Sequence, residues 1–306
     1  MQNRNAIRLV IGLTIIGVLA SSFDLRAVYN AVISAQIGYL FLAFLIYSVT
    51  LLILTIRWRG ILSQLGCSLP LAVAFQVFVA GVLLSDFTPA KLGDLSRPLL
   101  VKDRIPLSKG AVSVAIDKFA DLITVSLLGF SGMALLSNLS SRHLIIAAAS
   151  IIIVFFMSSL FWLKRSAFRS IMKRLGLDRL EQAAGDLEET ARSANGLPRL
   201  MTRSILITMV AWFTHAAETA FVARAFGYAV PIQVLFLLLP LLSALSLIPI
   251  TVSGLGLIEG GVTVMLASLG VPPATGMAIA LTDRVLTITV HLLFGSRYAL
   301  LFKIKK

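Results

Sequence analysis

Long apolar runs dominate this chain and decide what it can fold into. A helix crosses a bilayer with about 20 apolar residues. Six runs reach or approach that length: Leu9–Phe23, Ile37–Ile56, Ala111–Leu136, Leu144–Leu163, Ser204–Phe226 and Ala274–Phe302. The chain is 58% hydrophobic and 13% charged, whereas soluble domains run at roughly 45–50% and about 25%. The sequence therefore predicts an all-α, polytopic membrane protein with about six spanning helices, forming a single transmembrane domain over residues 1–306, and it excludes a soluble enzyme.

Two further apolar stretches, residues 69–100 and 232–269, are interrupted near their middle. The first break contains Pro89 and Gly93, and the second contains Pro249, Gly254 and Gly256. Proline and glycine end a helix, and apolar runs of 10–14 residues suit re-entrant segments better than full crossings. Irregular backbone at membrane depth persists only where protein buries it or water reaches it. We therefore expect both stretches to be re-entrant helical hairpins.

The basic residues predict the orientation. If neither hairpin crosses and both termini are cytoplasmic, nineteen of the 27 Lys and Arg face the cytoplasm, as the positive-inside rule requires. This explains the net charge of +13 without nucleic acid and predicts a bacterial-type cytoplasmic (inner) membrane. In this scheme Arg57 and Arg59 belong to a cytoplasmic loop. The first apolar run also resembles a cleavable signal peptide, and the sequence leaves open whether it is retained.

The chain divides into two similar halves, residues 37–137 and 204–302, separated by a polar connector. In each half a broken hairpin bearing a carboxylate, Asp94 or Glu259, precedes a long helix with an adjacent acid and base, Asp117-Lys118 or Asp283-Arg284. In the predicted topology the hairpins open from opposite sides, which is an inverted-topology repeat typical of alternating-access carriers. The connector, residues 164–200, has one apolar helical stripe and predicts an amphipathic surface helix. A docking site for a partner is the alternative.

Charged residues inside the apolar regions are the candidates for function, because charge at membrane depth is costly. Seven carboxylates and four cations lie there. The predicted substrate-binding set is Lys91, Asp94, Arg97, Asp117, Lys118, Asp121, Glu259, Asp283 and Arg284. They predict either a polar cavity that accepts a charged group or internal salt bridges. We expect the hairpin acids to pair with nearby cations, Asp94 with Lys118 or Arg97 and Glu259 with Arg284. Arginine suits a phosphate, because its guanidinium binds two oxygens at once.

The remaining polar residues predict little other chemistry. His215 and Glu218 lie one helical turn apart and form either a proton relay or a hydrogen-bonded structural pair. We expect no metal site, no cofactor and no catalytic activity, since no motif for any of them is present.

These residues resemble a known family. The combination of Gly93-Asp94, Asp117-Lys118-x2-Asp121 and the Gly254 to Glu259 segment with Arg284 and Gly295 is similar to the lysylphosphatidylglycerol synthase transmembrane-region family. The resemblance covers about Arg57 to Gly295. It implies a membrane protein that moves a lipid or a lipid-linked phosphate compound between leaflets. Asp94 and Asp117-Lys118 replace the family's usual Glu and Glu-Arg. We expect no soluble aminoacyl-transferring domain, so transport and not lipid synthesis is implied.

Three functions remain open on the sequence. The first is a flippase for an anionic or polyprenyl-phosphate lipid. The second is a proton-coupled carrier of a small anion, and the third is a non-transporting membrane partner of a lipid- or glycan-modifying enzyme. A lateral apolar opening would favour the first and a closed aqueous vestibule the second. The lipid, the driving force and the oligomeric state are not predicted.

Overall fold

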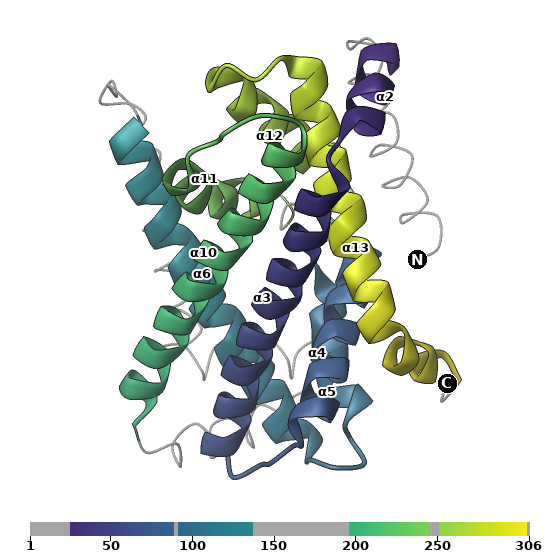
Figure 1. The fold of residues 1–306 in the computed structure, drawn as a ribbon. Coiled ribbons are helices and arrows are strands. Elements are labelled where there is room, and N and C mark those ends of the chain that lie inside the picture. The colour runs from purple at the N-terminus through teal and green to yellow at the C-terminus, as the bar shows by residue number, and fades with distance from the viewer. Residues whose placement is uncertain (1–24, 89–90, 137–195, 245, 247–250, 305–306) are drawn as a thin grey trace.

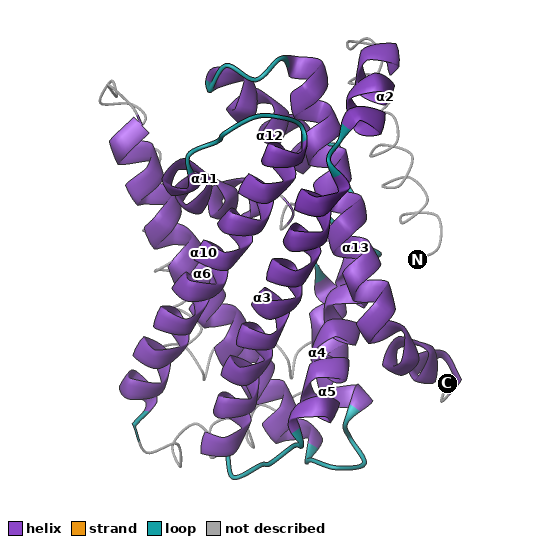
Figure 2. Ribbon diagram, in the orientation of Figure 1, coloured by secondary structure: helices purple, strands orange, loops and turns teal. Residues whose placement is uncertain are grey.

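The computed structural model describes residues 25–88, 91–136, 196–244, 246 and 251–304. Within these ranges the chain forms helices joined by short loops, with no β-strand (Figure 2). The all-helical prediction is therefore confirmed for this part of the protein. Several sequence predictions lie outside it: the apolar runs 9–23 and 144–163, most of the connector 164–200, and the break residues Pro89 and Pro249.

The described helices are arranged as an elongated bundle (Figure 1). In chain order they are α2 (Leu25–Ser34), α3 (Ile37–Gln64), α4 (Leu71–Asp86), the 3₁₀ turn η1 (Leu92–Ser96), α5 (Arg97–Leu100), α6 (Leu107–Leu136), α10 (Leu197–Ala225), α11 (Ile232–Ala244), α12 (Leu257–Ser268) and α13 (Pro273–Ile304). Three of them, α3, α10 and α13, are long and apolar enough to cross a membrane. The chain is a multi-pass integral membrane protein.

Helix α6 has the length of a spanning helix, because 30 residues extend about 45 Å at 1.5 Å per residue. It is less apolar than α3 because Asp117, Lys118 and Asp121 lie along it. Asp117 is fully buried, and all three charges have partners on other helices or on α6 itself. The charges of α6 therefore face the interior of the bundle.

The long helices pack in a crossed pattern. Helices α3 and α10 run antiparallel along the centre (Figure 1), with the Gln36 amide donating to the Ala225 carbonyl at 2.9 Å. Helix α4 of the first half packs on α13 of the second, and α11 of the second half packs on α6 of the first. Gly295 makes the first of these contacts close, because a Cβ there would lie 2.8 Å from the Ala80 nitrogen. Gly132 makes the α6–α11 contact close in the same way, because a Cβ there would lie 3.0 Å from the Cβ of Leu237.

Both predicted breaks are points where the chain turns back on itself. A Cβ on Gly93 would lie 2.1 Å from the backbone nitrogen of Ser85, and one on Gly254 would lie 3.0 Å from the Cα of Ser246. Lys91 and Ser253 are the two non-glycine residues of the described part with positive φ, 52° and 51°. Residues other than glycine rarely adopt this backbone conformation. Helices α4 and α5, which flank the first break, lie in the lower part of the bundle in Figure 1, and α11 and α12, which flank the second, lie in the upper part. That these are re-entrant hairpins of an inverted repeat stays a prediction.

Helix α3 corrects one prediction. It continues past Ile56 to Gln64, so Arg57 lies within a helix and is 2% exposed. The helix continues because Trp58, Ile61 and Leu62 extend its apolar contacts and are fully buried. The placement of Arg57 in a cytoplasmic loop was therefore wrong.

Candidate functional site

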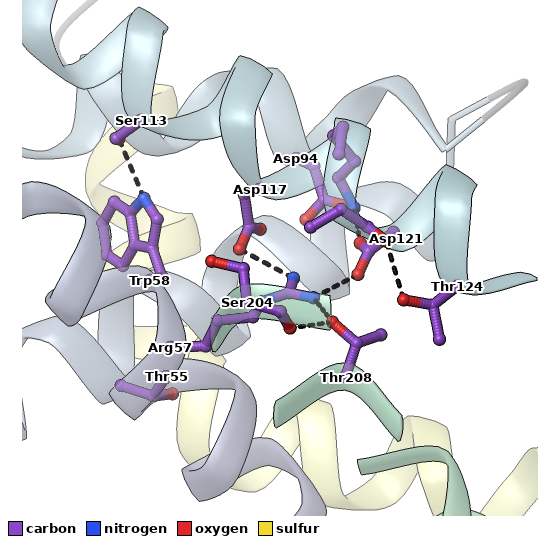
Figure 3. Close-up of polar contacts among 12 residues, drawn as sticks. Thr55, Arg57, Trp58, Asp94, Ser113, Asp117, Asp121, Thr124, Ser204 and Thr208 are labelled. Atoms are coloured by element: carbon purple, nitrogen blue, oxygen red, sulfur yellow. Dashed lines mark hydrogen bonds and ion pairs between the residues drawn. The ribbon is translucent and has the colours of Figure 1, made fainter. Parts of the chain in front are cut away.

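Arg57 is the centre of a buried charge network on the first half of the chain. Its guanidinium forms an ion pair with Asp117 at 2.7 Å, a second with Asp121, and donates a hydrogen bond to the Thr208 hydroxyl of α10 (Figure 3). Thr208 in turn donates to the Ser204 carbonyl at 2.7 Å. One arginine on α3 thus joins α6 to α10.

Arg97 links the first break to the same acids. Its guanidinium bonds to Asp94 at 2.6 Å and to Asp117 at 2.8 Å. It also lies over the Phe78 ring, 4.1 Å from the centroid, and against the glycine face of α4 at Gly81. Stacking on an aromatic ring while donating in plane is a geometry that arginine adopts and lysine does not. The break is therefore fixed to α6 through Asp117.

Lys118 completes the network, which we call the N-half network (Arg57, Asp94, Arg97, Asp117, Lys118 and Asp121). Its ammonium bridges Asp94 and Asp121, so the predicted pairing of Asp94 with Lys118 and Arg97 is confirmed. The Lys118 side chain is 41% exposed, whereas Arg57 and Arg97 are buried. The network contains three cations and three carboxylates and is formally neutral.

The second break has its own ion pair. Arg284 donates to Glu259 at 2.9 Å and to the Ser253 carbonyl at 3.3 Å, which confirms the predicted pair of Glu259 with Arg284. Glu259 also accepts a hydrogen bond from the Gly256 amide at 2.6 Å, at the beginning of α12. Arg284 therefore holds both the strained backbone and the helix that follows it.

Asp283 does not pair with its neighbour Arg284 but faces α10. The Thr219 hydroxyl lies 3.2 Å from Asp283 and 3.4 Å from Glu218, so the two carboxyls flank the same hydroxyl. We call Glu218 and Asp283 the acid pair. His215 Nδ1 lies 3.0 Å from Glu218, as the one-turn spacing predicts.

A third polar chain, which sequence reasoning missed, joins α3, α13 and α4. Tyr47 and His291 Nε2 are 2.8 Å apart, and His291 Nδ1 is 2.7 Å from Asp86. The Tyr47 ring also lies against the His215 ring. No spacing in the sequence connects these residues, because each lies on a different helix.

Members of the N-half network line a cavity of about 440 Å³, the central cavity, together with Tyr47 and His215. Its polar lining includes Lys91, Lys118, Asp121 and His215, and its apolar lining includes Leu51, Leu54, Leu122 and Val125. Tyr47 and Trp212 also line it. A second, small cavity of about 40 Å³ is lined by Thr219, Glu259, Asp283 and Arg284 among others.

The nine predicted binding residues therefore have different places. Lys91, Lys118 and Asp121 line the central cavity. Glu259, Asp283 and Arg284 line the small cavity. Asp94, Arg97 and Asp117 lie behind Lys118 and Asp121, in the N-half network. In the described part of the chain no group of three or more His, Cys, Asp and Glu side chains is arranged to hold a metal ion.

One signal for Arg57 was present in the sequence. The first half has four acids in its apolar regions, Asp86, Asp94, Asp117 and Asp121, against three cations, Lys91, Arg97 and Lys118. A buried carboxylate without a counter-charge is unfavourable, so one cation is missing from the balance. Extending α3 by one residue beyond the apolar run supplies it.

Comparison with known proteins agrees with this architecture. The family model of the lysylphosphatidylglycerol synthase TM region matches residues 5–295. A UPF0104 membrane protein of Pyrococcus horikoshii is 20% identical over 94% of both chains. Another, from Methanothermobacter thermautotrophicus, is 22% identical over 94% of this chain and 92% of its own. No solved structure matches the chain. With the family model covering nearly all of its length, the chain belongs to the lysylphosphatidylglycerol synthase transmembrane-region family.

Proposed function

We propose that this protein moves a phosphate-bearing lipid, or a lipid-linked phosphate compound of the polyprenyl-phosphate type, between the two leaflets. The observation that carries the proposal is the central cavity, which combines cations with an apolar wall inside a membrane protein. A cavity of about 440 Å³ falls in the size range of small-molecule sites. A charged headgroup would occupy it while the acyl or prenyl chains stay outside in the bilayer.

Charge favours an anion. The N-half network sums to zero, and no described residue makes an ion pair or side-chain hydrogen bond with the Lys91 ammonium. Lys91 and Lys118 both line the cavity, and Asp121 there is already bound by Arg57. Among the described residues that line the cavity, Lys91 is therefore a cation that no carboxylate contacts. A phosphate would supply the missing negative charge, as anions do at cationic sites in proteins.

The crossed helix packing supports an inverted repeat and alternating access. If the halves are related by a two-fold axis in the membrane plane, α4 corresponds to α11 and α6 to α13. The α4–α13 and α11–α6 contacts are then equivalent, and α3 and α10 meet across the axis. Each half also has one residue with positive φ at its break, Lys91 or Ser253, as such a repeat would have. Such repeats carry their substrate site where broken helices meet near the midplane.

The apolar wall favours a lipid over a free anion. Besides the leucines and Val125, it includes Tyr47 and Trp212, whose amphipathic rings suit the boundary between a polar headgroup and hydrocarbon. A carrier of a small inorganic anion has no need for such a surface. The proposal includes an inner-membrane location, cytoplasmic termini and hairpins that open from opposite sides.

Reconstitution tests the proposal. Purified protein in liposomes is given fluorescently headgroup-labelled phosphatidylglycerol, a labelled polyprenyl phosphate or labelled phosphatidylcholine, and an impermeant quencher reports the label that reaches the outer leaflet. We expect flux of a phosphate lipid that falls at least tenfold in Lys91→Asn, since asparagine tolerates positive φ but carries no charge. The matched control is Lys102→Asn, at an exposed lysine. Equal flux in both variants, or none above empty liposomes for the whole panel, would contradict the proposal.

A further inference from the structure

The two charge clusters differ in one respect that the lipid proposal does not use. The N-half network balances three acids with three fixed cations. The corresponding cluster of the second half contains three acids, Glu218, Glu259 and Asp283, and one guanidinium, that of Arg284. All of these groups lie in the interior, where an ionised carboxylate without a counter-charge is unfavourable and is neutralised by a proton. Glu259 is ion-paired with Arg284, so the imbalance lies in the acid pair.

The geometry of the acid pair fits a shared proton. Glu218 is fully buried, and its Oε1 has no hydrogen-bond partner among the described atoms. Its Oε2 and the Asp283 carboxyl share the Thr219 hydroxyl, which can donate only one hydrogen. Two carboxyls that flank one hydroxyl repel each other when both are ionised, and a proton on one of them removes that repulsion. A proton on Glu218 Oε2 lies beside His215 Nδ1, and it leaves the unpartnered Oε1 as an uncharged carbonyl oxygen.

His215 connects the acid pair to the central cavity. Its ring lies 3.0 Å from Glu218 through Nδ1 and also lines the central cavity. Asp283 and Thr219 line the small cavity on the other side of the pair, which has room for about one water molecule. The acid pair thus lies between two cavities. His215 faces the central cavity, and the Asp283 carboxyl faces the small cavity.

The other ionisable groups near the acid pair come from several of the helices that surround it. Helix α11 contains no ionisable residue in its range, Ile232–Ala244. Helix α10 contributes His215, and the remaining groups are Tyr47 on α3, Asp86 and Lys91 at the first break, Lys118 and Asp121 on α6, Glu259 on α12, and Arg284 and His291 on α13. Three of these groups have other partners: His291 pairs with Asp86, Arg284 with Glu259 and Lys118 with Asp94. No described cation forms an ion pair with either member of the acid pair, apart from His215 beside Glu218.

We propose that Glu218 and Asp283 form a proton-binding site that exchanges with water of the central cavity through His215. In release, the carboxyl O–H proton of Glu218 passes to His215 Nδ1 and His215 Nε2 gives a proton to cavity water, so a carboxylate and a hydronium ion form and the imidazole returns to neutral. Uptake is the reverse. No electron transfer and no further reactant is needed.

Release has a mechanical consequence. It leaves two adjacent carboxylates, whose repulsion drives α10 away from α13, while uptake draws the two helices together. Because α10 lines the central cavity, the protonation state would change the shape of that cavity. Coupling of the proton to lipid movement rests on the proposed function, whereas the proton site itself does not.

Infrared spectroscopy of the purified protein in nanodiscs tests the site without any lipid substrate. A protonated carboxyl has a C=O stretching band that a carboxylate lacks. At neutral pH we expect wild type to show protonated-carboxyl intensity that the neutral, near-isosteric double variant Glu218→Gln/Asp283→Asn lacks. The matched control Asp103→Asn, at an exposed acid, keeps it. Equal intensity in wild type and in the double variant would overturn the proposal.

A second variant tests the exchange route. His215→Phe keeps a ring against Tyr47 and Trp212 but cannot carry a proton. We expect it to retain the carboxyl band and to exchange that proton for deuterium at least tenfold more slowly, an effect that a purely structural role would not produce. An unchanged exchange rate would overturn the role of His215. Sodium is the competing ligand: a melting temperature that rises with NaCl in wild type but not in the double variant, with no carboxyl band, would overturn a proton site.

The coupling is read in the liposome assay under an imposed pH gradient. Wild type should respond to the gradient, and the double variant should show equal lipid flux in both gradient directions. Wild-type flux that ignores the gradient would overturn coupling. If wild type moves no lipid at all, the proposed function fails, and the infrared measurement still decides the proton site.

Discussion

Arg57 illustrates how a single side chain determines the interior of this protein. It is 2% exposed. It forms ion pairs with Asp117 and Asp121 of α6 and donates a hydrogen bond to the Thr208 hydroxyl of α10. Removing one partner from a buried ion pair leaves an uncompensated charge, which costs far more than the pair itself contributes. The stability of the bundle is therefore sensitive to this one position.

Arg57→Ala should lower the free energy of unfolding by about 3–5 kcal/mol, the usual cost of breaking a buried pair. The measurement is the thermal midpoint of the purified protein in detergent, followed by size-exclusion fluorescence. Arg59→Ala is the matched control, because Arg59 is exposed and its one described bond is to the Leu69 carbonyl. If both variants have the same thermal midpoint, the N-half network does not stabilise the fold as described.

Arg284 allows structural and transport roles to be separated. Arg284→Ala should destabilise the protein by leaving Glu259 without its cation, and Arg284→Ala/Glu259→Gln should recover much of the lost stability. If Arg284 also serves the lipid phosphate, the double variant stays without flux and Arg284→Lys transports at a reduced rate, because lysine keeps the charge but not the paired donors. Full lipid flux in the stable double variant would show that Arg284 is structural only.

At the scale of helices and loops, the breaks depend on glycine where backbone meets backbone. Gly93→Ala places a Cβ against the Leu84–Ser85 backbone, which cannot move as a flexible side chain can. We expect the free energy of unfolding to fall by about 3 kcal/mol, which is toward the upper end for an overpacked contact, and lipid flux to be lost. Gly38→Ala is the control, because nothing lies within 4 Å of its Cβ position. A thermal midpoint for Gly93→Ala equal to that control would mean that the chain does not turn back at this point.

The sequence predicted the helices better than their partners. Apolar runs and the glycine and proline breaks located α3, α4, α6, α10, α11, α12 and α13, because these signals are local. The pairs Asp94–Lys118 and Glu259–Arg284 were also predictable, since a costly charge requires a nearby opposite charge. The Tyr47–His291–Asp86 chain was not, because it depends on how three helices are rotated against one another. Arg57 was misplaced because a helix can continue beyond the first cation that interrupts its apolar run.

At the scale of the whole molecule, the proposed topology places the two breaks on opposite sides of the membrane. In a background with Cys67, the single cysteine, changed to alanine, Arg104→Cys should react with a membrane-impermeant maleimide only from the cytoplasmic side. Ala229→Cys, at an exposed position between α10 and α11, should react only from the other side. Labelling of both from one face would rule out the inverted repeat.

The crossed packing also sets the order in which this protein can be completed during synthesis. Helix α4 leaves the ribosome more than 200 residues before Gly295, the residue that packs closely on Val79 and Ala80. Until then the face of α4 that receives α13 has no cover, and the same holds for α6 until α11 arrives. Each half therefore completes its helix contacts only with helices of the other half. A nascent chain stalled between the halves would therefore present the membrane with an open helix face, the kind of surface that quality-control proteases and insertion chaperones recognise.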